Sequence, residues 1–320
     1  MCRERSSDDR NDPEFAEQGF ALLVVIWTTG LLAMLVAGFS LAVRTEVRSA
    51  SIAVENAEAE AMADAGVHLA VASLISARVN PPADRRIPAD GSPSFCALGD
   101  RGILRISIED EAGKIDLNVA NDRLLRALFL GLGLSDAEAA ARADAIIDFR
   151  DLDSQRRPSG AELMDYEAAG RLGPKNAPFA RAEELVQVAG MDPDSVLRLL
   201  PYVSVHSGQP GVGATVASKA LIALVARGHA KLTAPVGQQP ISQPLAEMPA
   251  EFAVASPQRA YSIRAEARTV RGSIFVREAV VELSRTRAGI SYGIKRWQRG
   301  QGISTDFNNA RAANALLSPC

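Results

Sequence analysis

FALLVVIWTTGLLAMLVAGFSLAV, residues 20–43, is a run of 24 residues without a charged side chain. A helix rises about 1.5 Å per residue, so this run extends roughly 36 Å, enough to cross a bilayer. A secretory signal peptide has a shorter apolar region of about 7–15 residues, with small residues at its cleavage site. Here Arg44, Glu46 and Arg48 follow instead. The other interpretation is a buried core helix, but the chain offers no apolar partner segment of matching length. We therefore predict one transmembrane helix.

The predicted helix continues past the apolar run. From Val47 to Leu69, small and apolar residues recur every three or four positions, and proline is absent until Pro81. These features predict one continuous helix from Phe20 to Arg78, roughly 88 Å long. Residues 20–43 are its membrane part and residues 44–79 its continuation outside the membrane.

Composition excludes several classes of protein. The chain has 320 residues, of which 47% are hydrophobic, and a net charge of −3. This composition excludes a wholly disordered chain and a multi-spanning transporter, and the near balance of charge argues against nucleic acid as a partner. Residues 1–19 are acidic, so the positive-inside rule does not assign the orientation. We find no nucleophile elbow, P-loop or dinucleotide fingerprint, so we do not expect an enzyme.

Strand patterns occur in two separate regions. Residues Gly102–Asp110 alternate as a strand, and Lys114–Asn118 is expected to return beside it after a turn. Three further alternating runs predict an antiparallel meander near the C-terminus. These runs are Tyr261–Arg268, Ile274–Leu283 and Ile290–Trp297.

Helical periodicity fills the chain between the two strand regions. Residues 120–234 predict a series of helices, with Ser135 and Glu138 at the spacing of a capping box. Residues 235–258 are rich in Gln and Pro and predict a linker or long loop. The tail, 300–320, is polar and is expected to be flexible.

A carboxylate-rich loop at 148–165 is the one candidate for site chemistry. Asp151, Asp153 and Gln155 occupy positions 1, 3 and 5 of a twelve-residue loop, and Glu162 occupies position 12. This is the spacing of an EF-hand, but Arg156 stands where the sharp turn needs glycine, so the loop is not an EF-hand. Two interpretations remain: a site for calcium, the cation that hard oxygen ligands prefer, or a polar loop whose carboxylates are neutralised by arginine. The candidate ligands are Asp151, Asp153, Glu162 and Asp165.

The N-terminal segment resembles the class III signal of type IV pilins and type II secretion pseudopilins. Glu17-Gln18-Gly19 ends a short polar leader, 1–19, and Phe20 opens the apolar helix. The resemblance implies that a prepilin peptidase cleaves between Gly19 and Phe20 and methylates the new N-terminus. The fifth residue after this cut is usually Glu in these proteins, and here it is Val24.

Two further stretches narrow the resemblance to one family. EDEAGKIDLNVANDRLLRALF, residues 109–129, and the strand sequence that begins YSIRAEAR at residue 261 are similar to the general secretion pathway protein K family of minor pseudopilins. Members of that family lack the usual Glu. The resemblance implies an α+β fold: a long N-terminal pilin helix packed on an antiparallel pilin-like sheet, with a large all-helical domain inserted. The sheet would comprise residues 80–119 and 259–299, and the inserted domain residues 120–234.

The resemblance also implies a function and a set of partners. A protein of this family caps the tip of the type II secretion pseudopilus and helps to initiate its assembly, for export of folded proteins across the outer membrane. Its partners would be other minor pseudopilins through the long helix, the prepilin peptidase and the inner-membrane secretion platform. It would cross the inner membrane once, with its C-terminal domain in the periplasm and calcium bound at the Asp-x-Asp…Gly-Ala-Glu loop. The alternative is a membrane-anchored periplasmic binding or hydrolytic protein that uses the carboxylates of 148–165.

The cysteines leave two possibilities open. Cys2 would be lost with the leader, whereas Cys96 and Cys320 would both lie in the oxidising periplasm. They can form a disulfide, or the tail cysteine can remain unpaired.

Overall fold

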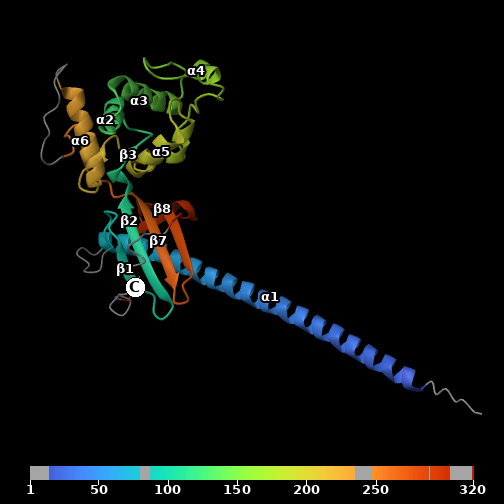
Figure 1. The fold of residues 1–320 in the computed structure, drawn as a ribbon. Helices are drawn as coiled ribbons and strands as arrows, with labels where there is room; N and C mark the ends of the chain where they lie inside the picture. Colours follow the sequence, from blue (N-terminus) through green and yellow to red (C-terminus); the bar gives the residue numbers. More distant parts are fainter. Residues whose placement is uncertain (1–13, 80–86, 235–246, 288, 303–318) are drawn as a thin grey trace, which may run out of the picture. The chain divides into compact units, whose positions relative to one another are not determined.

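The computed structural model describes residues 14–79, 87–234, 247–287, 289–302 and 319–320. The chain divides into two units, Met1–Ala57 and Glu58–Cys320. Each is described by itself, and Figure 1 gives the order of the elements.

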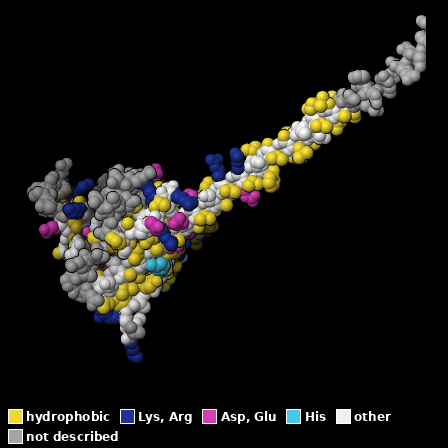
Figure 2. Space-filling model, turned by 90° about the horizontal axis from the view of Figure 1, so that it is seen from below, with side chains coloured by type: hydrophobic (Ala, Val, Ile, Leu, Met, Phe, Trp, Pro, Cys, Tyr) yellow, Lys and Arg dark blue, Asp and Glu magenta, His cyan; other side chains and the backbone are white. Residues whose placement is uncertain are grey.

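Helix α1 runs from Glu14 to Val79 as one helix of 66 residues. It begins before the predicted start at Phe20 and ends one residue after the predicted end at Arg78. In the first unit, apolar side chains surround the helix over residues 20–43, and charged side chains appear after this run (Figure 2). Within the described ranges, one helix is long and apolar enough to cross a membrane, with a mean hydropathy of 2.4 over 18 residues. This finding fits a single-pass membrane anchor.

In the second unit, a face of small residues lets α1 pack closely on a sheet. Ala59, Ala63 and Ala70 are fully buried, and they alternate along the helix with the larger Met62, Val67, Val71 and Leu74. Gly66 marks the closest approach, because a Cβ built on it would lie 2.9 Å from the Cβ of Ala265.

A buried arginine ties the same part of α1 to the sheet. Nε of Arg277 lies 2.5 Å from Oδ1 of Asp64, and its Nη2 lies 2.6 Å from Oε1 of Glu60. The guanidinium also stacks over the rings of Phe275 and Trp297, at 4.9 Å and 5.1 Å from their centroids. Charge and aromatic contact together therefore fix the register of the helix on the sheet.

The sheet has five strands in the order β1-β2-β7-β8-β9, and all neighbouring strands are antiparallel. Its face toward α1 is lined by Leu104, Ile106 and Ile263 and belongs to the same buried cluster as the helix. The strand bounds are β1 Ser94–Ala97, β2 Gly102–Asp110, β7 Ala260–Thr269, β8 Ile274–Thr286 and β9 Gly289–Arg299.

The expected return of Lys114–Asn118 beside the first strand is wrong. After β2 the chain makes a short 3-10 turn, η1 (Glu111–Gly113), and leaves the sheet. Residues Ile115–Asp116 form β3, which pairs in parallel with β4, Val203–Ser204. The place beside β2 is taken by β7, whose apolar face completes the surface under α1.

A helical domain with its own buried core stands between β2 and β7. Helices α2 and α6 approach so closely that a Cβ on Gly228 would lie 1.7 Å from the carbonyl oxygen of Ala127. Ser135 and Glu138 form the predicted capping box at the start of α3. The elements are α2 Asp122–Gly131, α3 Asp136–Arg150, α4 Leu163–Ala168, η2 Ala182–Gln187, α5 Pro193–Leu199, η3 Leu200–Tyr202 and α6 Lys219–Thr233.

The end of the predicted linker, 235–258, belongs to the helical domain. Phe252 is 2% exposed in its core, and β6 (Ala253–Val254) pairs in parallel with β5 (Val212–Gly213). Residues 235–246 of that prediction lie outside the described residues, as do 303–318 of the predicted tail.

Gly66→Leu tests the close packing of α1 on the sheet. The new side chain has no space against Ala265, so we expect a loss of about 1–3 kcal/mol in the free energy of unfolding. Urea unfolding of the full chain in detergent, followed by fluorescence of Trp297 in a Trp27→Phe background, measures this loss. Ala72→Leu on the exposed face of the same helix is the control and leaves stability nearly unchanged. Equal effects of the two substitutions would contradict the packing described.

Candidate functional site

The carboxylate loop connects α3 to α4 (Figure 1). Asp151 follows the last residue of α3 in extended backbone, and Glu162 stands directly before α4. The folding of the intervening loop brings these two residues, eleven positions apart in sequence, into mutual electrostatic influence.

Asp151 and Glu162 carry buried oxygen atoms that lack partners. Oδ1 of Asp151 has no hydrogen-bond partner among the described residues, and neither carboxylate oxygen of Glu162 has one of ordinary geometry, although this carboxylate faces the backbone N–H groups of Leu163 and Asp165 at the start of α4. Burial raises the pKa of Asp151, and the charge of Asp153 adds to the effect. Burial also raises the pKa of Glu162, with further contributions from Asp148, Asp151 and Asp153. Buried carboxylates of this kind are costly in their charged form, which is the physical reason for both pKa shifts.

Asp148 is a member of this cluster that the sequence-based list of ligands omits. Its side chain is fully buried, and burial raises its pKa to about 6, although the backbone N–H of Arg157 donates to it at 3.2 Å. A Cβ on Gly160 would lie 1.9 Å from its Oδ2, so only glycine lets the loop close over it. The available signal was the spacing of Asp144 and Asp148, four residues apart on the helix that leads into Asp151.

The loop arginines neutralise other carboxylates. Nε of Arg157 lies 2.8 Å from Oδ1 of Asp144. Nε of Arg156 donates to the carbonyl of Gly160 at 2.9 Å and lies 3.5 Å from Oδ2 of Asp165. That oxygen of Asp165 also accepts the backbone N–H of Glu162 at 3.0 Å. The structure therefore gives Asp165 a role in starting α4 and in pairing with arginine.

The donor set fits a hard cation in part. Within the described residues, no group of three or more His, Cys, Asp or Glu side chains is arranged to hold a metal ion. Asp151 and Glu162 have free buried oxygens, whereas Oδ1 of the exposed Asp153 accepts the N–H of Gln155 at 2.8 Å. A cation between Asp151 and Glu162 would need backbone carbonyls or water as further ligands, both of which calcium accepts.

The predicted processing residues lie inside α1. Gly19 and Phe20 belong to the helix that begins at Glu14, and Val24 is 42% exposed on it. The hydroxyl of the nearby Thr29 donates to the carbonyl oxygen of Val25 at 2.7 Å, so this polar group has its hydrogen-bond partner within the helix. No charged side chain occurs between residues 20 and 43, so this stretch can enter the apolar core of a membrane without the cost of burying a charge there.

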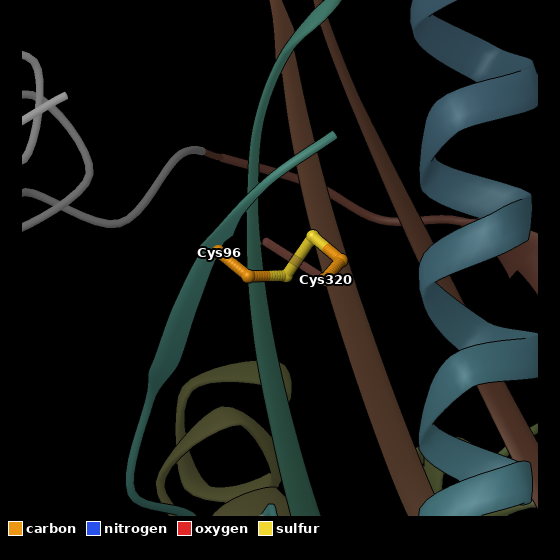
Figure 3. The surroundings of a disulfide bond; sticks show 2 residues. All are labelled: Cys96 and Cys320. Atoms are coloured by element: carbon orange, nitrogen blue, oxygen red, sulfur yellow. A yellow bond between two sulfur atoms is a disulfide. The ribbon is translucent and has the colours of Figure 1, made fainter. Parts of the chain in front are cut away.

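Cys96 and Cys320 are joined by a disulfide in the structure, with their Cα atoms 5.0 Å apart (Figure 3). The backbone N–H of Cys320 donates to the carbonyl of Ala97 at 3.0 Å. The bond joins the C-terminus to β1 across 224 positions of sequence.

Comparison with known proteins places these features in a class. A chain of a solved structure, "The Crystal Structure of the GspK-GspI-GspJ complex from enterotoxigenic Escherichia coli Type 2 Secretion System", has 18% sequence identity and a TM-score of 0.58. The match covers 80% of this chain and 100% of that one. The two chains share a fold, which in this chain is an N-terminal helix on an antiparallel sheet with an added helical domain. No curated protein sequence matches this chain.

The sequence family is more specific than the fold. Residues 107–208, which run from β2 through most of the helical domain, match the family "Type II secretion system (T2SS), protein K". The resemblance to minor pseudopilins of the protein K family, and the α+β architecture that it implied, are confirmed.

Removal of the disulfide is expected to destabilise the second unit. Cys96→Ser, Cys320→Ser and the double variant should each lose about 2–5 kcal/mol of unfolding free energy, because all three break the same constraint on the unfolded chain. Urea unfolding under oxidising conditions measures the loss. Cys2→Ser is the control and leaves stability unchanged. A double variant that loses the sum of the two single losses would contradict a bond between these cysteines.

Proposed function

We propose that this chain is a minor pseudopilin that caps the tip of the type II secretion pseudopilus and helps to initiate its assembly. The observation that carries the proposal is the match of residues 107–208 to protein K of type II secretion. The fold supports it, because a single apolar helix continues directly into the helix that packs on the sheet. Such a chain is a structural component, and its role in export of folded proteins needs no catalysis of its own.

The tip position is supported by Val24. In a filament, a carboxylate at this depth pairs with the N-terminal amine of the neighbouring subunit, since an unpaired charge in lipid is costly. Val24 offers no such carboxylate. The next subunit therefore has no partner for its amine in that register, and growth past this chain is disfavoured.

The partners follow from the same proposal. The solved relative is part of a complex with GspI and GspJ. We expect the corresponding minor pseudopilins to pack on α1 of this chain, with anchorage in the inner membrane and the C-terminal unit in the periplasm. A prepilin peptidase would cleave between Gly19 and Phe20 and methylate Phe20, and the inner-membrane platform would receive the processed chain.

Calcium is proposed as the ligand of the carboxylate loop. The buried oxygens of Asp151 and Glu162 support this proposal. The raised pKa values of both side chains show that their negative charges are poorly compensated, and a bound cation would compensate them. When bound, calcium would offset the repulsion among these carboxylates and link the end of α3 to the start of α4. Asp153 is a candidate for a further ligand. Asp165 is not, because it already pairs with Arg156 and accepts the backbone N–H of Glu162 at the start of α4.

Co-expression with a prepilin peptidase and the other minor pseudopilins tests the proposed function. We expect intact-mass analysis to find a chain that begins at methylated Phe20, and purification of this chain to retain the other minor pseudopilins in stoichiometric amounts. Gly19→Leu should remain uncleaved because the side chain blocks the peptidase at the residue before the cut.

Gly30→Leu is the matched control, since a Cβ there meets no atom within 4 Å and the site of cleavage is untouched. A mature chain that retains its leader, or that begins after Val43, would reject the proposal. So would failure of the processed chain to retain any other minor pseudopilin, and both results would favour the alternative of an anchored binding or hydrolytic protein.

Calcium is expected to raise the melting temperature of the chain in a pH-dependent way. At about 100 times the Kd, binding adds about 2.7 kcal/mol of stability. Asp148, whose pKa is about 6, takes up a proton as the pH falls toward 5.5, which reduces the negative charge that favours calcium, and the raised pKa values of Asp151 and Glu162 act in the same direction. The rise should therefore be larger at pH 7.5 than at pH 5.5.

Without calcium, we expect the melting temperature itself to depend on pH in the opposite direction. Protonation of Asp148, whose pKa is about 6 when folded, stabilises the fold at low pH, and this stability is lost as the pH rises through that value. In chelator, the melting temperature should then increase from pH 7.5 to 5.5. Asp151→Asn with Glu162→Gln should remove the response to calcium, and Asp100→Asn in an exposed turn is the control. No response of the parent chain at pH 7.5 would refute the site.

A further inference from the structure

Large apolar side chains are exposed together around α4, on the side of the helical domain away from α6 (Figure 1). Leu152 is 84% exposed, Met164 is 82% exposed, Leu172 is fully exposed and half of Leu163 is exposed. Single exposed apolar residues are ordinary on a protein surface, whereas a group of them marks a surface that binds another molecule. We call these four residues the α4 patch.

Three separate segments of the chain build the α4 patch. Leu163 and Met164 belong to the first turn of α4, and Cδ1 of Leu163 lies 3.0 Å from a Cβ built on Gly173, the residue after Leu172. Leu152 stands in the loop after α3, where the charges of both its neighbours, 151 and 153, act on the carboxylate that directly precedes Leu163. The four side chains therefore lie in one region of the surface.

Ordered structure holds the α4 patch outward. Tyr166 is buried on the other face of α4, and its hydroxyl oxygen accepts the backbone N–H of Ala189 at 2.9 Å. The helix ends at Gly170, whose φ of 69° places it in the left-handed region. The N–H of Gly170 donates to the carbonyl of Glu167 at 2.9 Å, and that of Arg171 to the carbonyl of Tyr166 at 2.8 Å. This is a Schellman motif, so Leu172 is exposed on a hydrogen-bonded turn and does not fold back over the domain.

The charges around the α4 patch leave a negative excess. Between Asp151 and Gly173 the chain has five acidic residues and three arginines. The arginines are already bonded: Arg156 to Asp165, Arg157 to Asp144, and Arg171 to the backbone carbonyls of Val186 and Val188. Asp153 and Glu167 are exposed, and neither forms an ion pair within the described ranges. A cation bound at the carboxylate loop would leave the charge of Glu167 in place.

We propose that the α4 patch is a docking surface for a polypeptide segment whose apolar side chains alternate with lysine or arginine. Burial of the exposed leucine and methionine side chains supplies the driving force. The acidic rim selects basic flanking residues and disfavours acidic ones. It also disfavours an anionic lipid surface, the other apolar partner. This surface belongs to the helical domain and is separate from α1, so it goes beyond the proposed role in pseudopilus assembly.

The test titrates peptides into the full chain, labelled with 13C at the methionine methyl groups, in nanodiscs of phosphatidylcholine. The chain has six methionines, so Met164 reports on the α4 patch and the other five are internal references. The probe is the peptide KLAKLAKLAK. One control peptide has glutamate in place of every lysine, and a second has serine in place of every leucine.

We expect the probe to shift the Met164 signal in a saturable way, and each control peptide to bind at least tenfold more weakly. Absence of a saturable shift, or equal binding of the probe and either control, overturns the proposal. A shift of Met164 on addition of phosphatidylcholine vesicles without peptide would assign the α4 patch to a lipid surface and overturn it as well.

Variants at exposed positions locate the binding surface. Leu152→Ser with Leu172→Ser should weaken binding of the probe by about tenfold or more, because both apolar contacts are lost. Val270→Ser, in the exposed turn after β7, should leave the affinity unchanged. Glu167→Gln should weaken binding by about two- to fivefold, whereas Glu247→Gln, also exposed, should not. Equal effects of a patch variant and its control would overturn the assignment, and none of these results depends on peptidase processing or on other pseudopilins.

Discussion

A buried carboxylate holds the sheet and the helical domain together at the point where the chain passes between them. Oε1 of Glu111 accepts from Nζ of Lys114 at 2.9 Å and from the hydroxyl of Ser262 on β7 at 2.5 Å, and its other oxygen accepts from Ser204 on β4. Burial by itself would raise the pKa of Glu111, but Lys114 and the two hydroxyls outweigh it and lower the pKa. Removal of any one partner would leave a buried charge under-compensated, so β4, β7 and η1 are held in one arrangement.

The contacts of Glu111 matter because the helical domain is inserted in the sequence between two paired strands, β2 and β7. Asp110, the last residue of β2, stands opposite Tyr261 of β7, so the chain leaves and re-enters the sheet at one place. Local alternation was sufficient to predict Gly102–Asp110 as a strand. It was misleading for Lys114–Asn118, because the partner of β3 lies in Val203–Ser204, far along the chain, and two-residue parallel pairing leaves no local pattern.

The carboxylate loop shows the same limit of sequence reasoning. Spacing identified Asp151, whose Oδ1 is buried without a hydrogen-bond partner, and Glu162, whose side chain is buried before α4. Spacing equally selected Asp165, which Arg156 and a backbone N–H occupy, and passed over Asp148, which is fully buried. Sequence position determines which acids can meet, but which of them lose water and which find donors depends on the closure of the loop over α3.

The sheet edges explain why assembly would fall to α1. On β9 the pairing with β8 shifts register between Val280 and Val281, and the charged Lys295 stands at the irregularity, paired with Glu282 at 2.8 Å. Bulges and lysines are features that oppose edge-to-edge pairing. At the opposite edge, the backbone N–H of Cys320 donates to a carbonyl oxygen of β1, and the disulfide holds Cys320 in this position. With pairing opposed at both edges, strand addition is a poor route to association. The long helix, whose apolar side chains over residues 20–43 are exposed, then offers the more favourable surface for the proposed contact with other subunits.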